Sequence, residues 1–114
     1  MSDIIEVQEW VATVPATEFE TNGSNAVLVN GKQIAIYYFA DTQEWYATDN
    51  ECPHQKQQAL SRGIIGSEGD EPKVACPFHK KSFSLKTGQC LSGEDYKVNT
   101  YPVKVEDGVV YLGI

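Results

Sequence analysis

"AVLVNGKQIAIYYF" (residues 26–39) is the stretch that decides the fold, because it places two apolar runs on either side of Asn30-Gly31. Asn-Gly between apolar runs is typical of a two-residue β-hairpin turn. Further along the chain, "WYATD" (45–49) follows a turn and predicts another strand. "YPVKVEDGVVYLGI" (101–114) predicts a second hairpin, which turns at its Glu-Asp-Gly.

Shorter patterns fill the rest of the chain. "EWVATV" (9–14) and "KVACP" (73–77) are strand candidates, and "QKQQALSRG" (55–63) predicts a helical turn that ends at Gly63. Many short strands separated by turns favour an all-β fold, either an antiparallel sandwich or a small barrel. A length of 114 residues suits one domain over residues 1–114.

The composition excludes several classes of function. The formal net charge is −7, which argues against binding to nucleic acid or to an anionic membrane, since both need a basic surface. The first ten residues contain no basic region and no long apolar run, so we expect neither a signal peptide nor a membrane-spanning helix. Three cysteines, an odd number, argue against a disulfide framework and favour a reducing cytoplasm.

Two short motifs concentrate the metal-binding side chains. Cys52-x-His54 is followed, after 21 residues, by Cys76-x-x-His79, and these hold both histidines and two of the three cysteines of the chain. Thiolate and neutral imidazole are common ligands of zinc and iron. A proline after each cysteine restricts the backbone of its loop. The pattern therefore predicts a metal site built from two loops.

The spacing leaves the metal open. Two sulfur and two nitrogen ligands suit a tetrahedral zinc ion, and they also suit a [2Fe–2S] centre in which cysteines hold one iron and histidines the other. Zinc ligand pairs are more often separated by two to four residues, so the tight Cys-x-His favours the iron–sulfur centre.

This ligand pattern in a small β-rich chain resembles the Rieske iron–sulfur family. The resemblance implies a Rieske-type β sandwich or small barrel with two cluster-binding loops and one [2Fe–2S] cluster. It places Cys52 and Cys76 on one iron, and His54 and His79 on the other. The longer segments "CPHQKQQALSRGIIG" (52–66), "KVACPFHKKSFSLKTGQCLSGEDYKV" (73–98) and "TYPVKVEDGVVYL" (100–112) are similar to small subunits of assimilatory NAD(P)H nitrite reductases.

That similarity implies a partner. The partner would be a large subunit holding FAD, a [4Fe–4S] cluster and sirohaem, and the complex would reduce nitrite to ammonia. The chain itself would carry single electrons and would contain no catalytic residue. It has no Gly-x-Gly-x-x-Gly motif for a nicotinamide cofactor, so catalysis is expected on the partner.

Several positions depart from the wider family. The cysteines that form a disulfide in respiratory Rieske proteins correspond here to Gln57 and Phe78, and the Ser and Tyr that donate hydrogen bonds to the cluster correspond to Lys81 and Phe83. Cys90 is expected to be a buried structural residue. Leu60 has two interpretations: it covers the cluster, or it is an ordinary core residue.

Charge is distributed unevenly. Residues 52–86 have a net charge of +3, which leaves −10 on the rest of the chain. The charged residues of this segment are Lys56, Arg62, Lys73, Lys80, Lys81 and Lys86, with Glu68, Asp70 and Glu71. The segment is either a basic rim around an electron-transfer surface or a solvated loop with scattered lysines.

Two other functions stay open. The chain could be a free Rieske ferredoxin that supplies an aromatic-ring dioxygenase. Alternatively, the four ligands could hold a structural zinc ion in a docking module. An absorption spectrum separates zinc from iron.

Overall fold

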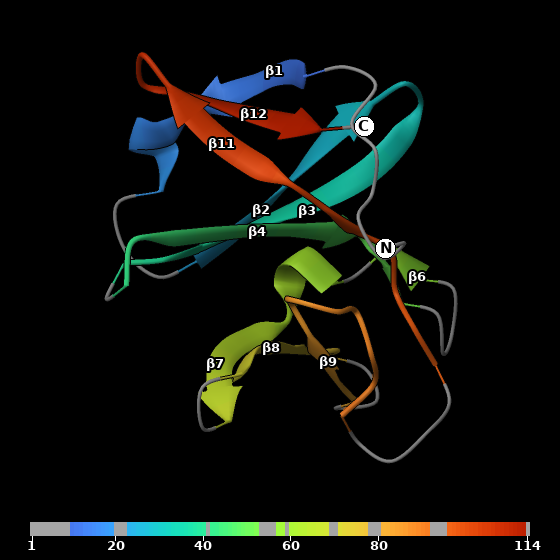
Figure 1. Cartoon of the computed structure of the whole chain (residues 1–114). Helices are drawn as coiled ribbons and strands as arrows, with labels where there is room; N and C mark the ends of the chain where they lie inside the picture. The colour runs from blue at the N-terminus through green and yellow to red at the C-terminus, as the bar shows by residue number, and fades with distance from the viewer. Residues whose placement is uncertain are drawn as a thin grey trace, which may run out of the picture.

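The computed structural model of this chain is built almost entirely from antiparallel β-strands (Figure 1). The structure describes residues 10–19, 23–40, 42–52, 57–58, 60–68, 71–77, 81–91 and 96–113. The strands are β1 (Trp10–Pro15), β2 (Gly23–Val29), β3 (Lys32–Phe39), β4 (Glu44–Asp49), β5 (Glu51–Cys52), β6 (Gln57–Gln58), β7 (Ile64–Glu68), β8 (Glu71–Ala75), β9 (Ser82–Ser84), β10 (Thr100–Tyr101), β11 (Val103–Glu106) and β12 (Val109–Gly113). Two 3-10 turns are η1 (Ala16–Glu18) and η2 (Leu60–Arg62).

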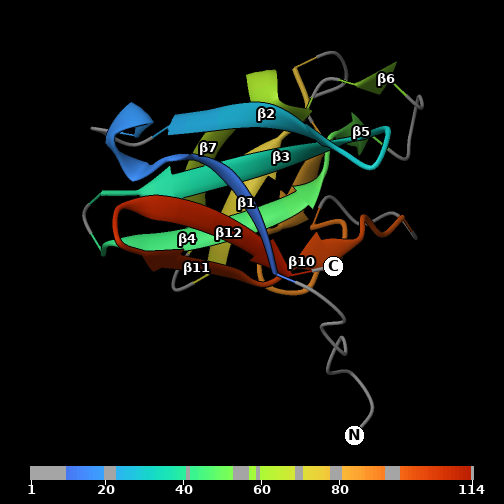
Figure 2. The ribbon, with the colours of Figure 1, turned by 90° about the horizontal axis from the view of Figure 1, so that it is seen from above.

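Within these residues the strands form four sheets. Their orders are β1-β12-β11, β10-β4-β3-β2, β5-β6 and β7-β8-β9. The β1-β12-β11 sheet lies on one side of β2, β3 and β4, and the β7-β8-β9 sheet lies on the other, as two perpendicular views agree (Figures 1 and 2). The predicted all-β antiparallel architecture is confirmed.

Both predicted hairpins are confirmed, and their turns explain why. Asn30 and Gly31 have φ angles of 52° and 80°, and Asp107 and Gly108 have φ angles of 51° and 77°. Two successive residues with positive φ form the turn whose twist matches that of paired strands, and Asn, Asp and Gly tolerate it best. The turns join β2 to β3 and β11 to β12. The strand predicted at 45–49 is observed as β4.

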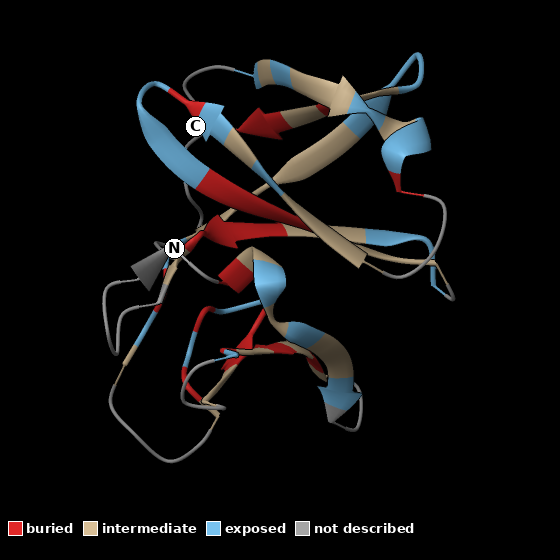
Figure 3. Cartoon of the chain, turned by 180° about the vertical axis from the view of Figure 1, so that it is seen from behind, coloured by how far each residue is buried: buried red, intermediate tan, exposed pale blue. Residues whose placement is uncertain are grey.

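Strand β3 is buried on both faces and contributes to two cores. Since successive side chains of a strand point to opposite faces, Ile34 and Ile36 enter one core, and Ala35 and Tyr37 enter the other. All four are at most 2% exposed. Figure 3 shows this buried stretch between the two outer sheets. The central strand therefore links the two cores.

We name the two cores by their position in Figure 1. The upper core lies between the β1-β12-β11 sheet and β2-β3-β4, and the lower core lies between β3 and the β7-β8-β9 sheet. The buried residues of the upper core are Phe19, Val29, Ile34, Ile36, Ala47, Val110 and Leu112. Those of the lower core are Ala35, Tyr37, Leu60, Val74, Cys76, Phe83, Leu85, Cys90 and Val98.

The helical prediction for residues 55–63 is confirmed at η2 and wrong at residues 57 and 58, while residues 55, 56 and 59 lie outside the described residues. Residues 57 and 58 instead form β6, which pairs with β5, so an interstrand contact overrides the local helical pattern. The predicted strand at 73–77 begins earlier and ends at Ala75. None of the helical segments in the described residues is long and apolar enough to span a membrane.

Candidate metal centre

The structure brings the two cysteines of the motif to the ends of short strands. Cys52 is the last residue of β5, and its backbone pairs with Gln57. Cys76 directly follows β8. His54 and His79 lie outside the described residues, so the four-ligand set stays a prediction. Within the residues that are described, no group of three His, Cys, Asp or Glu side chains comes together.

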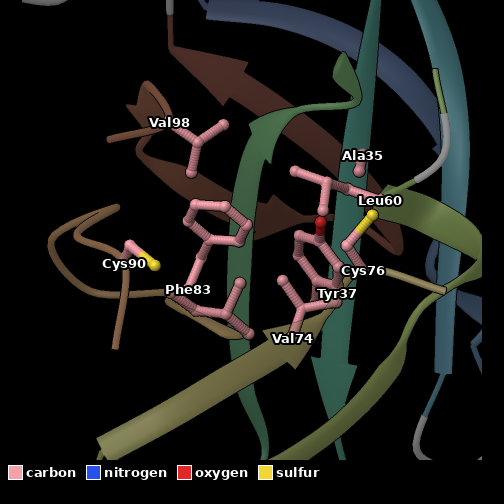
Figure 4. Close-up of a cluster of buried hydrophobic side chains, with 9 residues drawn as sticks. Ala35, Tyr37, Leu60, Val74, Cys76, Phe83, Cys90 and Val98 are labelled. Atoms are coloured by element: carbon pink, nitrogen blue, oxygen red, sulfur yellow. The ribbon is translucent and has the colours of Figure 1, made fainter. Parts of the chain in front are cut away.

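Cys76 is buried in the lower core. It is 1% exposed, and its N–H donates a 2.8 Å hydrogen bond to the Lys81 carbonyl oxygen. This bond closes the segment between β8 and β9, on which the second motif lies. Figure 4 shows Cys76 among the buried hydrophobic side chains of Tyr37, Leu60 and Val74. The thiol therefore lies in apolar surroundings with little access to water.

The lower core also contains three residues that the sequence singles out. Leu60 is fully buried and belongs to the same group of packed hydrophobic side chains as Cys76. Phe83 is fully buried too, and its register partner is Val74, two residues before Cys76. Cys90, 7% exposed, is a buried core residue as predicted.

A polar network precedes the first motif, and no local pattern in the sequence predicts it. The carboxylate of Asp49 accepts hydrogen bonds from Tyr101 Oη at 2.5 Å and from Asn99 Nδ2 at 3.0 Å. Lys32 Nζ lies 3.1 Å from the same carboxylate, which raises the pKa of that lysine. Burial, followed by the hydrogen bond to Asp49, raises the pKa of Tyr101. These contacts tie the end of β4 to β3 and β10.

The basic segment is described only in part. Arg62 and Lys86 are exposed, whereas Lys73 and Lys81 are half-buried. Lys56 and Lys80 lie outside the described residues. The described lysines and arginine thus lie on several elements of the lower part of the molecule, and a rim around a cluster stays a prediction.

Comparison with known proteins identifies the fold family. A family model described as a Rieske-like [2Fe-2S] domain matches residues 9–113. The chain belongs to the Rieske-like [2Fe-2S] domain family. The cofactor of this family is a single Rieske [2Fe–2S] cluster. Membership therefore favours the iron–sulfur interpretation of the two motifs over the zinc interpretation.

Three relatives each align with most of this chain. The chain is 36% identical to a nitrite reductase (NADH) small subunit of Salmonella typhimurium, over 75% of this chain and 79% of that one. It is 40% identical to a nitrite reductase [NAD(P)H] large subunit of Klebsiella oxytoca, over 72% of this chain but 8% of the relative. It is 37% identical to a ferredoxin component of naphthalene 1,2-dioxygenase/salicylate 5-hydroxylase systems of Ralstonia sp, over 92% of this chain and 95% of that one.

A solved structure confirms the Rieske-type fold. The NMR structure of the Escherichia coli protein NirD superimposes with a TM-score of 0.81 at 30% identity, covering 91% of this chain and 94% of the other. The predicted all-β fold of Rieske type, a sandwich or small barrel of antiparallel strands, is therefore confirmed.

The donor set of this Rieske domain fits its cofactor. Two thiols and two imidazoles are the ligands that a Rieske cluster needs, and the chain offers them in two motifs at the ends of β5 and β8. The buried position of Cys76 suits a cluster sulfur ligand that must be shielded from water. When bound, the cluster supplies one-electron transfer.

Proposed function

We propose that this chain is a Rieske electron-transfer protein that works as the small subunit of an assimilatory NAD(P)H-dependent nitrite reductase. The single observation that carries the proposal is its similarity to the Salmonella small subunit, which extends over most of both chains. In the proposed site, Cys52 and Cys76 hold one iron, and His54 and His79 hold the other. The whole chain, residues 1–114, acts as one domain in the cytoplasm.

The chain's own residues supply ligands, orientation and shielding. The hydrogen bond from Cys76 N–H to the Lys81 carbonyl joins the two ends of the segment that carries the second motif, and the lower core keeps water from the Cys76 thiol. Phe83 has no hydroxyl to donate to a cluster sulfur. Because such hydrogen bonds stabilise the reduced state, their absence favours a low reduction potential within the Rieske range.

The proposed partner is a large subunit that carries FAD, a [4Fe–4S] cluster and sirohaem and reduces nitrite to ammonia. The Klebsiella large subunit supports this pairing, since a segment similar to this chain forms a small part of that longer protein. A module that is separate in one protein and part of a larger chain in another is expected to work beside the rest of that chain.

A second candidate function is a ferredoxin that supplies an aromatic-ring dioxygenase. The Ralstonia ferredoxin component favours it, because the match extends over nearly the full length of both chains. Such a protein would bind its oxygenase transiently, whereas a nitrite reductase subunit would form a stable complex.

The ligand set is tested by iron and sulfide analysis, absorption spectroscopy and low-temperature EPR of the reduced protein. We expect two irons and two sulfides per chain and a Rieske signal that the His54→Ala and His79→Ala changes abolish. Cys90→Ala is the matched control, since it removes the third cysteine and should leave the signal intact. Stoichiometric zinc in protein made with ample iron would contradict the proposed centre.

The partner is tested by purifying tagged protein from cells grown on nitrate. We expect a large flavin- and sirohaem-containing chain to copurify, and the complex to oxidise NADH or NADPH in a nitrite-dependent reaction. A chain that purifies alone but reduces a ring-hydroxylating oxygenase would instead support the ferredoxin function.

A further inference from the structure

Asn50 occupies an unusual place for a polar side chain. It lies between β4 and β5, two residues before Cys52, and is 1% exposed. A buried amide is costly unless its donors and acceptors are paired. Its surroundings therefore indicate what the residue does.

Among the described residues, four hydrogen bonds hold Asn50, and they connect it to two other parts of the chain. Its backbone N–H and its Nδ2 donate to the backbone carbonyl and Oε1 of Gln33, at 3.1 and 2.9 Å. Its Oδ1 accepts from the Ser61 N–H at 2.7 Å, and its carbonyl oxygen accepts from the Leu60 N–H at 3.0 Å. Asn50 thus fixes the start of η2 against the strand that leads to Cys52.

The other end of this turn meets β8, the strand that leads to the second motif. The Gly63 N–H donates to the Leu60 carbonyl oxygen at 3.0 Å, which closes the turn. A Cβ atom at Gly63 would lie 2.2 Å from the Ala75 carbonyl oxygen and 2.9 Å from Val74 Cγ2. Such distances are shorter than van der Waals contact, so only glycine allows this approach. Ala75 directly precedes Cys76.

Residues 60–63, which we call the bridging turn, therefore contact both ligand-bearing segments. Figure 1 shows the turn between β4 and β8, and Figure 3 shows the same arrangement from behind. Leu60 anchors the turn in the lower core beside Cys76. A series of hydrogen bonds and packing contacts thus connects the Cys52 segment to the Cys76 segment through Asn50, the bridging turn and Ala75.

We propose that Asn50 and Gly63 are positioning residues of the cluster site. Asn50 holds the bridging turn at a fixed distance from the Cys52 segment, and Gly63 lets the same turn pack directly against the Cys76 segment. Together they set the spacing between the two motifs. This inference rests on the proposed ligand set, and neither residue contacts the cluster itself.

A purely structural role would give a different result. If Asn50 only satisfied buried polar groups, its removal would lower stability and leave the cluster unchanged in any protein that still folds. If it positions the motifs, its removal also changes the EPR line shape and the rate of cluster loss. Two glycines and two polar residues of this chain provide matched pairs that separate these roles.

The experiment compares Asn50→Ala with Thr13→Ala, and Gly63→Ala with Gly66→Ala. Thr13 Oγ1 donates to the Val110 carbonyl oxygen at 2.8 Å, so its removal also breaks a side-chain to backbone hydrogen bond, but in the upper part of the molecule. A Cβ atom at Gly66, three residues beyond Gly63, would meet nothing within 4 Å. The measurements are the EPR spectrum of the reduced protein, the rate at which a chelator removes iron, and the urea midpoint.

We expect Asn50→Ala and Gly63→Ala to shift or broaden the Rieske signal and to accelerate iron loss about 10-fold, at the lower end of what supporting residues of metal sites contribute. Thr13→Ala and Gly66→Ala should match the wild type in both readouts. If Asn50→Ala does not fold, the Gly63 and Gly66 pair decides. The inference would be overturned if the Asn50 and Gly63 variants kept wild-type spectra and wild-type rates of iron loss. Equal changes in a variant and its control would overturn it as well. Neither result would affect the proposed function. A wild-type protein without the Rieske signal would overturn the proposed function, and this inference with it.

Discussion

Leu60→Ala is the substitution whose effect follows most directly from the structure. Leu60 is fully buried, and its truncation would leave a cavity in the lower core. Fully buried Leu→Ala changes cost about 3–5 kcal/mol of the free energy of unfolding. With an entropy of unfolding of about 2.1 cal/mol/K per residue, a chain of 114 residues gains about 240 cal/mol/K. A loss of about 3 kcal/mol therefore lowers the melting temperature by about 12 °C.

Leu112→Ala is the matched control, because Leu112 is also fully buried but belongs to the upper core. Circular dichroism at one scan rate should show a similar fall in melting temperature for both variants. Only Leu60→Ala should also speed the loss of cluster absorbance, since Leu60 shares its core with Cys76. A fall of less than about 4 °C for Leu60→Ala, which corresponds to about 1 kcal/mol, would show that the residue is not tightly packed. Equal cluster loss in both variants would refute the separation of the two cores.

Three further predictions concern potential, docking and pH. Phe83→Tyr should raise the reduction potential measured by spectroelectrochemistry, because it adds a hydroxyl donor, and a wild-type potential above about +150 mV would contradict this reasoning. The paired changes Lys80→Glu and Lys81→Glu should slow stopped-flow electron transfer to the partner at low salt only, and equal rates across about 20–500 mM salt would exclude a basic rim. The urea midpoint should fall above about pH 10, where unfolded tyrosines ionise, because burial raises the pKa of Tyr46 to about 12 and that of Tyr37 further still. Tyr46→Phe should reduce this fall, and a midpoint constant from about pH 9 to 11 would contradict it.

The elements that the sequence predicts well are those whose signal is local. Asn30-Gly31 and Asp107-Gly108 require backbone angles that few other residues adopt, so both hairpins can be placed from a few residues. Strands β5, β6 and β10 have two residues each, which is too short for any alternation to be visible. They exist because of their pairing partners, and a pairing between distant segments leaves no trace in a local pattern.

The residues of the candidate site also differ in whether a local sequence pattern predicts them. Cys52 and Cys76 stand out because thiols and imidazoles paired in two compact motifs are rare outside metal sites. Asn50 has no such signal, since "TDNEC" (48–52) resembles an ordinary polar turn. Its burial depends on Gln33 and on the Ser61 N–H, which the fold brings from both directions along the chain. The sequence predicts Gly63 only as the end of a helical turn, because its contact with Ala75 exists only in three dimensions.

The position of strand β3 has a consequence for how the two cores depend on each other. Its four central residues belong alternately to the two cores, so both cores depend on the position of this one strand. A shift of one residue in its pairing would send the Tyr37 phenol, now bonded to Thr48 Oγ1 at 3.0 Å, into the opposite core and away from that hydroxyl. The strand therefore has one acceptable alignment. A slip of this strand would therefore disturb both cores at once, whereas a single truncation within one core leaves the alignment in place.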